Sequence, residues 1–169
     1  FRSLTYEQAH EVMSDIMDGT FSDSEIAGFL MALAVKGETA PEIAGFATAM
    51  REKMVPVSIS VDAIDMCGTG GDGMGTFNIS TAASFVVAGA GVPVAKHGNR
   101  SISSKSGSAD VLGELGVDIQ MPAAKVAENI NEIGVGFLFA PAYHPAMRHV
   151  MPARKSLAVR TVFNIMGPL

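Results

Sequence analysis

A glycine-rich segment at residues 68–75 constrains the fold of this chain more than any other feature. It holds five glycines, follows a short apolar run and leads into Asn78-Ile-Ser-Thr, whose amide and hydroxyl groups are typical of a helix start. Glycine lets the backbone expose its N–H groups in conformations that other residues avoid, and a helix N-terminus attracts anions. The segment therefore predicts a loop that binds phosphate or pyrophosphate at the start of a helix.

The charge pattern supports the same interpretation. The whole chain has a net charge of −5, which argues against a nucleic-acid-binding surface. Between Asp72 and Asp110, however, the sequence has no acidic residue, whereas Lys96, Arg100 and Lys105 fall in this window. We expect this purely basic window to attract a phosphorylated small molecule.

Composition narrows the class of protein. The chain has 169 residues and one cysteine, so it forms no internal disulfide and a reducing, cytoplasmic setting is expected. The longest apolar stretch, Ala82–Gly91, is about half of the roughly 20 residues that span a bilayer, so no membrane association is expected. Because the chain starts at Phe1 rather than Met and stops inside an apolar segment, we expect a fragment whose C-terminal part is missing.

Three helix signals follow one another at the N-terminus. Each begins with a capping box, in which a Ser or Thr is followed three residues later by Glu or Gln, and continues with apolar residues at helical spacing. The pairs are Thr5 with Gln8, Ser22 with Glu25 and Thr39 with Glu42. These signals predict a small helical domain at residues 1–56.

After Pro56 the period of the pattern changes to alternating strands and helices. This order predicts an α/β domain at residues 57–140 with a mainly parallel central sheet, buried on both faces. The predicted strands are Val61–Met66, Val92–Ala95, Val117–Ile119 and Val135–Phe139, and the predicted helices are Ser80–Ala90, Ser108–Leu115 and Pro122–Ile133. Residues 141–169 are expected to form a helical return segment, with helices at Ala146–Val150 and Ala153–Ala158, and the start of the truncated remainder.

The motif Lys96-His-Gly-Asn-Arg100 follows the second predicted strand, where open α/β sheets bind ligands. Lysine offers a point charge for phosphate, His97 and Asn99 offer directional hydrogen bonds, and Gly98 permits close approach of the backbone. The serine-rich continuation from Ser101 onward adds hydroxyl donors. By itself this continuation has the composition of an ordinary solvated loop, but its place after the glycine segment favours ligand binding.

Other chemistries are less well supported. The glycine segment also satisfies G-x-G-x-x-G, yet its helix signal begins only at Asn78 and no carboxylate follows the second strand to bind a ribose, which disfavours a nicotinamide dinucleotide. His144 and His149 are five residues apart and so do not share a helix face, and the sequence has no Cys/His pattern that binds zinc. Arg154, taken alone, resembles an ordinary surface arginine.

With these residues in view, the chain resembles the anthranilate phosphoribosyltransferase family over essentially its whole length. The resemblance depends on several motifs in order and at the family's spacing. They are Gly-Thr-Gly-Gly-Asp (68–72), Asn-Ile-Ser-Thr (78–81), Lys-His-Gly-Asn-Arg (96–100), Gly-Ser-Ala-Asp (107–110), Phe-Ala-Pro (139–141), His-Pro-Ala-Met (144–147) and Arg-Thr-Val-Phe-Asn (160–164).

The resemblance implies a role for each matching residue. The site for phosphoribosyl pyrophosphate (PRPP) would comprise Gly68, Gly71, Asp72, Thr76, Asn78, Ile79, Ser80, Thr81, Lys96, His97, Gly98, Asn99, Arg100, Ser101, Ile102, Ser103, Ser104 and Ser108. The anthranilate site would comprise Gly68, His97, Asn99 and Arg154, with Arg154 recognising the carboxylate. Ser80 would be a ligand of Mg²⁺, and no residue would act as a catalytic nucleophile.

The same resemblance implies an activity and an assembly. The expected reaction transfers the phosphoribosyl group of PRPP to the amine of anthranilate in tryptophan biosynthesis, in a homodimer formed through the helical domain. The family's acidic Asp-Glu pair, which holds a second Mg²⁺, would lie beyond residue 169, so the activity of this chain alone is left open. Two alternatives also remain: a pyrimidine nucleoside phosphorylase of the same fold, and a non-catalytic binding relative.

Three positions depart from the family pattern. Gly113-Glu114 replaces the more usual Glu-Ala, and Ala158 stands where glycine is common.

Overall fold

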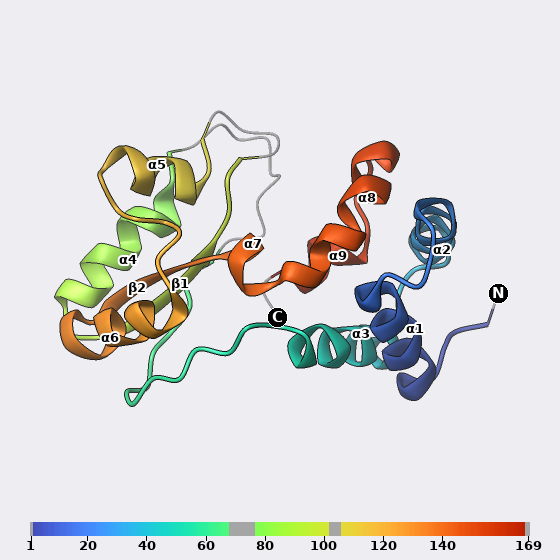
Figure 1. Cartoon of the computed structure of the whole chain (residues 1–169), viewed down its shortest axis with the longest axis horizontal. Coiled ribbons are helices and arrows are strands. Elements are labelled where there is room, and N and C mark those ends of the chain that lie inside the picture. The colour runs from blue at the N-terminus through green and yellow to red at the C-terminus, as the bar shows by residue number, and fades with distance from the viewer. Residues whose placement is uncertain (1, 68–76, 102–105, 168–169) are drawn as a thin grey trace. The chain divides into compact units, whose positions relative to one another are not determined.

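The computed structural model describes residues 2–67, 77–101 and 106–167 (Figure 1). The chain divides into two compact units, one made of Phe1–Met54 with His144–Leu169 and the other of Val55–Tyr143. The boundaries expected after residues 56 and 140 remain a prediction. None of the described helices is long and apolar enough to cross a membrane.

The helical unit contains the three N-terminal helices and the last helices of the chain (Figure 1). Its elements are α1 (Tyr6–Asp18), α2 (Asp23–Lys36), α3 (Ala40–Glu52), the 3₁₀ helix η1 (Pro145–His149), α8 (Met151–Leu157) and α9 (Val162–Met166). The predicted capping boxes mark the starts of α1 and α2. In the first, Gln8 donates its backbone N–H to the Thr5 hydroxyl at 3.2 Å, and the Thr5 N–H donates to the Gln8 side chain at 3.0 Å.

One apolar core joins the two parts of this unit. Met13, Leu30 and Phe46 from α1, α2 and α3 are fully buried, and they belong to the same cluster as Val150 and Phe163. The segment after His144 therefore packs against the N-terminal helices, in agreement with the predicted return of the chain.

Glu42 is the most deeply buried carboxylate among the described residues, with 0% of its surface exposed. Its side chain accepts hydrogen bonds from the Lys36 ammonium at 2.8 Å, the Leu4 N–H at 2.9 Å and the Thr39 N–H and hydroxyl, both at 2.8 Å. Burial by itself raises the pKa of Glu42, but these hydrogen bonds outweigh it and lower the pKa to about 2. Glu42 thus stays ionised inside the helical unit.

The α/β unit is built around a short parallel sheet (Figure 1). Its elements are α4 (Ile79–Gly89), β1 (Val94–Gly98), α5 (Ser108–Glu114), α6 (Ala123–Ile133), β2 (Val135–Phe139) and α7 (Ala140–Tyr143). β1 pairs with β2 in parallel, from Val94 opposite Val135 to Gly98 opposite Phe139, and Ile64 forms an isolated parallel bridge to Val94. The parallel sheet expected from the sequence is confirmed for these strands.

Three strand predictions need correction. Val61–Met66 contributes only the bridge at Ile64. Val117–Ile119 is not a strand, because the backbone turns at Gly116, which has φ +86°, and a three-residue segment with Asp118 at its centre is too short to establish a ladder. The strand expected at Val92–Ala95 begins two residues later and runs to Gly98, so Lys96 and His97 lie within it rather than after it.

The sheet is also less buried than expected. In β2 only Gly136 is buried, where a Cβ atom would meet side chains of α6 such as Ile130 at 2.6 Å. α6 therefore packs closely on one face at this point. The expectation of burial on both faces came from the apolar composition of the strands, and it does not hold for β2 in the part of the chain that the structure describes.

Candidate functional site

The candidate site lies at the end of β1. Lys96, His97 and Gly98 form the last three residues of this strand, and Asn99 and Arg100 continue from it. In an open α/β sheet the carboxyl ends of parallel strands are where ligands bind. The polar residues of the predicted motif therefore lie at the edge of the sheet that the fold assigns to binding.

The start of α4 is joined to the serine-rich segment. Asn78, the residue before α4, donates its side-chain amide to the Ser106 carbonyl at 3.3 Å, and the Ser106 hydroxyl donates to the Asn78 side chain at 3.1 Å. These residues are 28 positions apart in the sequence. The helix start and the segment after β1, which the sequence identified separately, are therefore neighbours in space.

Asp110, near the start of α5, holds the other end of this segment together. Its carboxylate accepts hydrogen bonds from the Ser101 N–H at 3.0 Å, the Gly107 N–H at 2.8 Å and the Arg100 guanidinium at 3.0 Å. The two backbone hydrogen bonds are the main reason that the pKa of Asp110 is lowered. Asp110 thus brings residues 101 and 107 to one carboxylate.

Gly98 and Gly107 allow this close packing. A Cβ atom on Gly107 would lie 2.5 Å from backbone atoms of Asn99, Arg100 and Ser101, and one on Gly98 would collide with the Ser108 hydroxyl and the Phe137 ring. Both positions therefore require the absence of a side chain, for reasons of space rather than of backbone angle.

Lys96 and His97 differ in their surroundings. Lys96 is 4% exposed, and its ammonium donates to the Met66 carbonyl at 3.1 Å. Burial lowers its pKa, and the nearby Asp65 and Cys67 offset only part of this effect. Lys96 therefore contacts the chain immediately before the glycine segment. Its predicted contact with phosphate remains a prediction.

His97 is held against Asp65. Its backbone N–H donates to one Asp65 oxygen at 3.1 Å, and its Nδ1 lies 3.9 Å from the other. Burial lowers the pKa of the imidazole and Lys96 adds to this, whereas Asp65 acts in the opposite direction. The net downward shift favours a neutral ring near pH 7, which can donate one hydrogen bond and accept another.

The first turn of α4 contains the buried hydroxyl of Thr81. Thr81 is buried, and its Oγ1 has no hydrogen-bond partner within the described ranges. Buried polar groups are normally hydrogen-bonded, and exceptions are often found where a ligand or water completes the site. Ser80 and Ile79 lie beside it in the same turn, where Ser80 is half-buried and Ile79 is 54% exposed.

Arg154 belongs to the helical unit, on α8. Its guanidinium lies 5.4 Å from the centre of the Phe163 ring, a cation–π contact, and burial lowers its pKa. No described carboxylate forms an ion pair with it. A half-buried guanidinium with an aromatic ring on one side and no acidic partner in the described part of the chain is suited to an incoming carboxylate.

The predicted site residues therefore fall into three groups. The structure gathers one group at the end of β1 and the starts of α4 and α5, namely Asn78, Ile79, Ser80, Thr81, Lys96, His97, Gly98, Asn99, Arg100, Ser101 and Ser108. Arg154 lies in the other compact unit. Gly68, Gly71, Asp72, Thr76, Ile102, Ser103 and Ser104 lie outside the described residues.

Sequence reasoning missed two carboxylates. Two acidic residues outside the basic window contact residues within it. Asp65 contacts His97, and Asp110 contacts Arg100. The spacing of Gly107 and Asp110, three residues apart at a helix start, is a capping signal that could have indicated the second contact. Nothing in the sequence indicates that Asp65 would face a residue 32 positions later.

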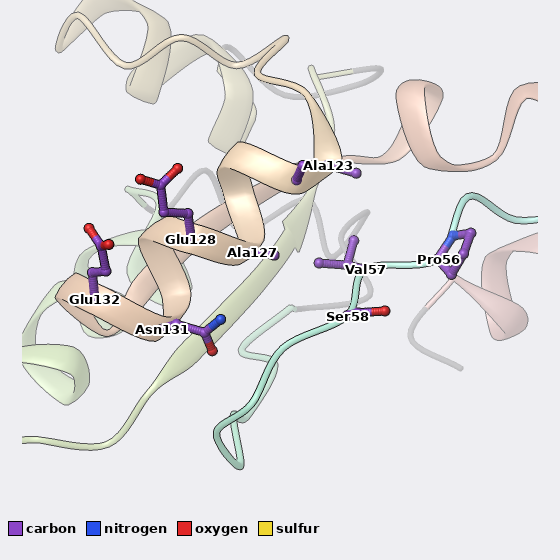
Figure 2. A pocket seen from close by; sticks show the side chains of 9 residues that line it. Pro56, Val57, Ser58, Ala123, Ala127, Glu128, Asn131 and Glu132 are labelled. Atoms are coloured by element: carbon purple, nitrogen blue, oxygen red, sulfur yellow. The ribbon is translucent and has the colours of Figure 1, made fainter.

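A separate pocket of about 570 Å³ lies between the segment at Pro56–Ser58 and α6 (Figure 2). Figure 2 shows alanines of α6 and Val57 along it, with Glu128 and Glu132 projecting nearby. None of the predicted site residues lines it. Its apolar, acidic-rimmed character does not suit a phosphorylated ligand.

The comparisons with known proteins agree with the fold and with the motifs. Residues 2–54 match the glycosyl transferase family helical bundle domain, and residues 60–169 match the glycosyl transferase family a/b domain. The chain is 58% identical over 169 residues to anthranilate phosphoribosyltransferase of Clostridium kluyveri, covering 99% of this chain and 50% of that protein. The chain spans about half the length of the curated relatives it matches.

Solved structures show the same relationship. The anthranilate phosphoribosyltransferase of Thermus thermophilus superimposes with a TM-score of 0.95 at 52% identity, over 99% of this chain and 51% of that one. The Saccharomyces cerevisiae enzyme in complex with PRPP and Mg gives 0.88 at 33% identity, over 98% and 50%. The same yeast enzyme with 4-fluoroanthranilate gives 0.81 at 32% identity, over 98% and 48%. The chain therefore belongs to the glycosyl transferase family whose members join a helical bundle domain to an α/β domain.

Proposed function

We propose that the full-length protein transfers the phosphoribosyl group of PRPP to the amine of anthranilate, with release of pyrophosphate, in tryptophan biosynthesis. Curated relatives at 54%, 55% and 58% identity carry the name of this enzyme. The observation in the α/β unit that supports the proposal best is the meeting of three segments. The end of β1, the start of α4 and the turn closed by Asp110 form one polar edge, which suits a phosphorylated sugar.

The α/β residues would bind and orient PRPP. The first turn of α4 would receive the 5-phosphate, since helix N-termini favour anions and the Thr81 hydroxyl has no partner among the described residues. Asn99 and His97 at the end of β1 would face the ribose and the aromatic acid. The glycine segment, outside the described residues, is proposed to surround the pyrophosphate.

Mg²⁺ fits this arrangement as a cofactor, and the yeast relative was solved with PRPP and Mg. Mg²⁺ commonly takes few protein ligands, because substrate phosphates and water complete its shell. Ser80 offers a single half-buried hydroxyl in the first turn of α4, and we propose it as that ligand. When bound, the ion would neutralise charge on the departing pyrophosphate.

The chemistry needs no nucleophile from the protein. The amine nitrogen of anthranilate would form the new bond to the anomeric carbon as the bond from that carbon to pyrophosphate breaks, and the amine would lose a proton. The chain's part is to align the two substrates and to place donors around the leaving group. Arg154 is proposed to bind the anthranilate carboxylate, because its guanidinium has no described acidic partner.

The proposal is tested by following anthranilate fluorescence in the presence of PRPP and Mg²⁺ with the full-length protein. Arg154→Ala should raise the KM for anthranilate by about 10–150-fold, the equivalent of a charge-assisted hydrogen bond of about 1.5–3 kcal/mol, and leave that for PRPP nearly unchanged. Lys155→Ala removes the same charge from the next, exposed residue and serves as the control. Equal effects on both substrates would contradict the assigned role, and phosphorolysis of uridine or thymidine without anthranilate consumption would favour the nucleoside phosphorylase.

We also propose that the protein is a cytoplasmic homodimer that associates through the helical unit. α2 exposes Met31 and Val35, at 36% and 70%, and Val35 is the most exposed large apolar residue among those described in the helical unit. Val35→Glu should shift the full-length protein toward monomer in sedimentation experiments, and an unchanged dimer would exclude this face.

A further inference from the structure

Three side chains of different chemistry converge beside the predicted substrate site. Asp65, Cys67 and His97 each offer one metal-binding atom, and these three atoms all lie within 4.8 Å of one another. A carboxylate oxygen, a thiol sulfur and an imidazole nitrogen therefore surround one point. The sequence did not suggest this group, because His97 is 30 residues from Cys67 and the three residues match no familiar spacing.

The backbone holds the group in place. Ile64 donates its N–H to the Pro93 carbonyl at 2.9 Å and accepts from the Ala95 N–H at 2.9 Å, so the segment before Asp65 is fastened to β1. One step further along, Asp65 accepts the His97 N–H at 3.1 Å. The three ligands thus come from two segments that are already hydrogen-bonded side by side, and little ordering is needed to assemble them.

The donor set selects a class of metal. Sulfur and imidazole ligands suit Zn²⁺ and Co²⁺, whereas Mg²⁺ prefers oxygen alone. Three protein ligands also leave a fourth position open, as in zinc sites that exchange water or substrate. This group is therefore distinct in chemistry from the Ser80 hydroxyl proposed for Mg²⁺.

The dimensions agree with a tetrahedral ion. Bonds of roughly 2.0–2.3 Å place neighbouring ligand atoms roughly 3.3–3.8 Å apart. Asp65 Oδ2 and His97 Nδ1 are 3.9 Å apart, so this pair nearly meets the requirement. The widest separation, at most 4.8 Å, has to close by roughly 1–1.5 Å, which side-chain rotation can supply because Asp65 is exposed and Cys67 and His97 are partly so.

Nearby charged groups also affect the binding of a metal ion at this site. The Lys96 ammonium lies nearby, on the Met66 carbonyl, and opposes a divalent ion. Two anionic ligands, the Asp65 carboxylate and the Cys67 thiolate, offset the charge of the ion. Formation of the metal–sulfur bond releases the thiol proton to solvent.

We propose that Asp65, Cys67 and His97 bind one Zn²⁺ or Co²⁺ ion, and that the bound ion inhibits the enzyme by withdrawing His97 from the substrates. The second part rests on the proposed function, in which His97 faces PRPP and anthranilate. The first part depends only on the geometry of the three ligands.

Binding is tested by titrating the full-length protein with Co²⁺ and recording the difference spectrum between wild type and Cys67→Ser. A thiolate-to-cobalt charge-transfer band should appear in this difference. Asp65→Asn, which keeps an oxygen for the His97 N–H, should weaken Co²⁺ binding by at least about tenfold, since even outer-shell partners are worth about 10–100-fold. His10 on α1 is hydrogen-bonded to Glu52 and is far in sequence from the three ligands, so His10→Gln serves as the control. This variant should still show the charge-transfer band.

The two parts have separable outcomes. Absence of a Cys67-dependent band overturns the site, whether or not the protein is active. If the band is present and the protein transfers phosphoribosyl groups, Zn²⁺ at fixed Mg²⁺ should inhibit wild type at a concentration at least about tenfold lower than it inhibits Cys67→Ser. Equal inhibition of both overturns the inhibitory role, and a band in a protein without transferase activity supports the site while contradicting the proposed function.

Discussion

Replacing Glu42 with glutamine should lower the free energy of unfolding by about 3 kcal/mol at pH 7. The carboxylate is fully buried, and its pKa falls from 4.5 to about 2. Each pKa unit corresponds to about 1.4 kcal/mol, so a shift of about 2.5 units gives this figure. Removing one partner from a buried ion pair generally costs about 3–5 kcal/mol, which is a similar amount. That cost applies here because the Lys36 ammonium would be left without its ionic partner and with only 13% of its side chain exposed.

The same shift predicts a pH dependence. Because the folded-state pKa lies below the unfolded value, the stabilisation by Glu42 is fully present above about pH 4.5 and is lost as the pH falls toward 2. The Glu42→Gln variant has no carboxyl group at this position and lacks this dependence. The difference in unfolding free energy between wild type and variant should therefore shrink as the pH drops from 4.5 to 2.

Urea unfolding followed by far-UV circular dichroism measures both effects, and it suits a chain without tryptophan. Glu11→Gln, at an exposed position on α1, removes the same charge and should change the unfolding free energy by less than about 0.5 kcal/mol. A Glu42→Gln effect as small as that of the control would refute the reasoning. So would a difference that stays constant across the acidic range.

Three further experiments test close packing and backbone conformation. Gly45→Ala should lower the free energy of unfolding by about 1–3 kcal/mol in urea, because the new Cβ would meet the Tyr6 carbonyl and lie 2.9 Å from the Ala9 Cβ. Gly28→Ala is the control: this position faces open space on α2, so the substitution should raise the free energy of unfolding by up to about 1 kcal/mol. Ala158→Gly should stabilise by about 1 kcal/mol and raise Tm, since Ala158 has φ 52°, and an unchanged or lower Tm would contradict this. Gly107→Ala should weaken PRPP binding about tenfold in calorimetry of the full-length protein, because overpacking by about 1–3 kcal/mol would displace residues 99–101, while Gly113→Ala should not.

The sequence predicted what is decided locally. The starts of α1 and α2 follow from side-chain hydrogen bonds between residues three apart, and such signals are present in any short window of sequence. The strands were less predictable because their extent depends on partners. Val117 and Ile119 are β-branched apolar residues like Val135 of β2, but no neighbouring strand among the described residues pairs with them.

The site likewise combines features that local sequence predicts with contacts that it does not. The sequence identified the polar residues at the end of β1 and at the start of α4, because their types and order are distinctive. It did not reveal the contacts that join them, since Asn78 with Ser106 and Asp65 with His97 are 28 and 32 positions apart. Glu42 was predicted as a capping residue, and its burial with Lys36 depends on packing that no local pattern encodes.

The ends of the helical unit are made at different times during synthesis. Its core needs Val150 and Phe163 as well as Met13 and Leu30, yet 115 residues separate position 54 from position 169. At about 5–20 residues per second, a ribosome takes roughly 6–23 s to cover that interval. During this interval the nascent N-terminal helices lack the C-terminal helices that complete their core. A chaperone that binds apolar helices would have its best opportunity then, and slower translation of the inserted α/β unit would lengthen it.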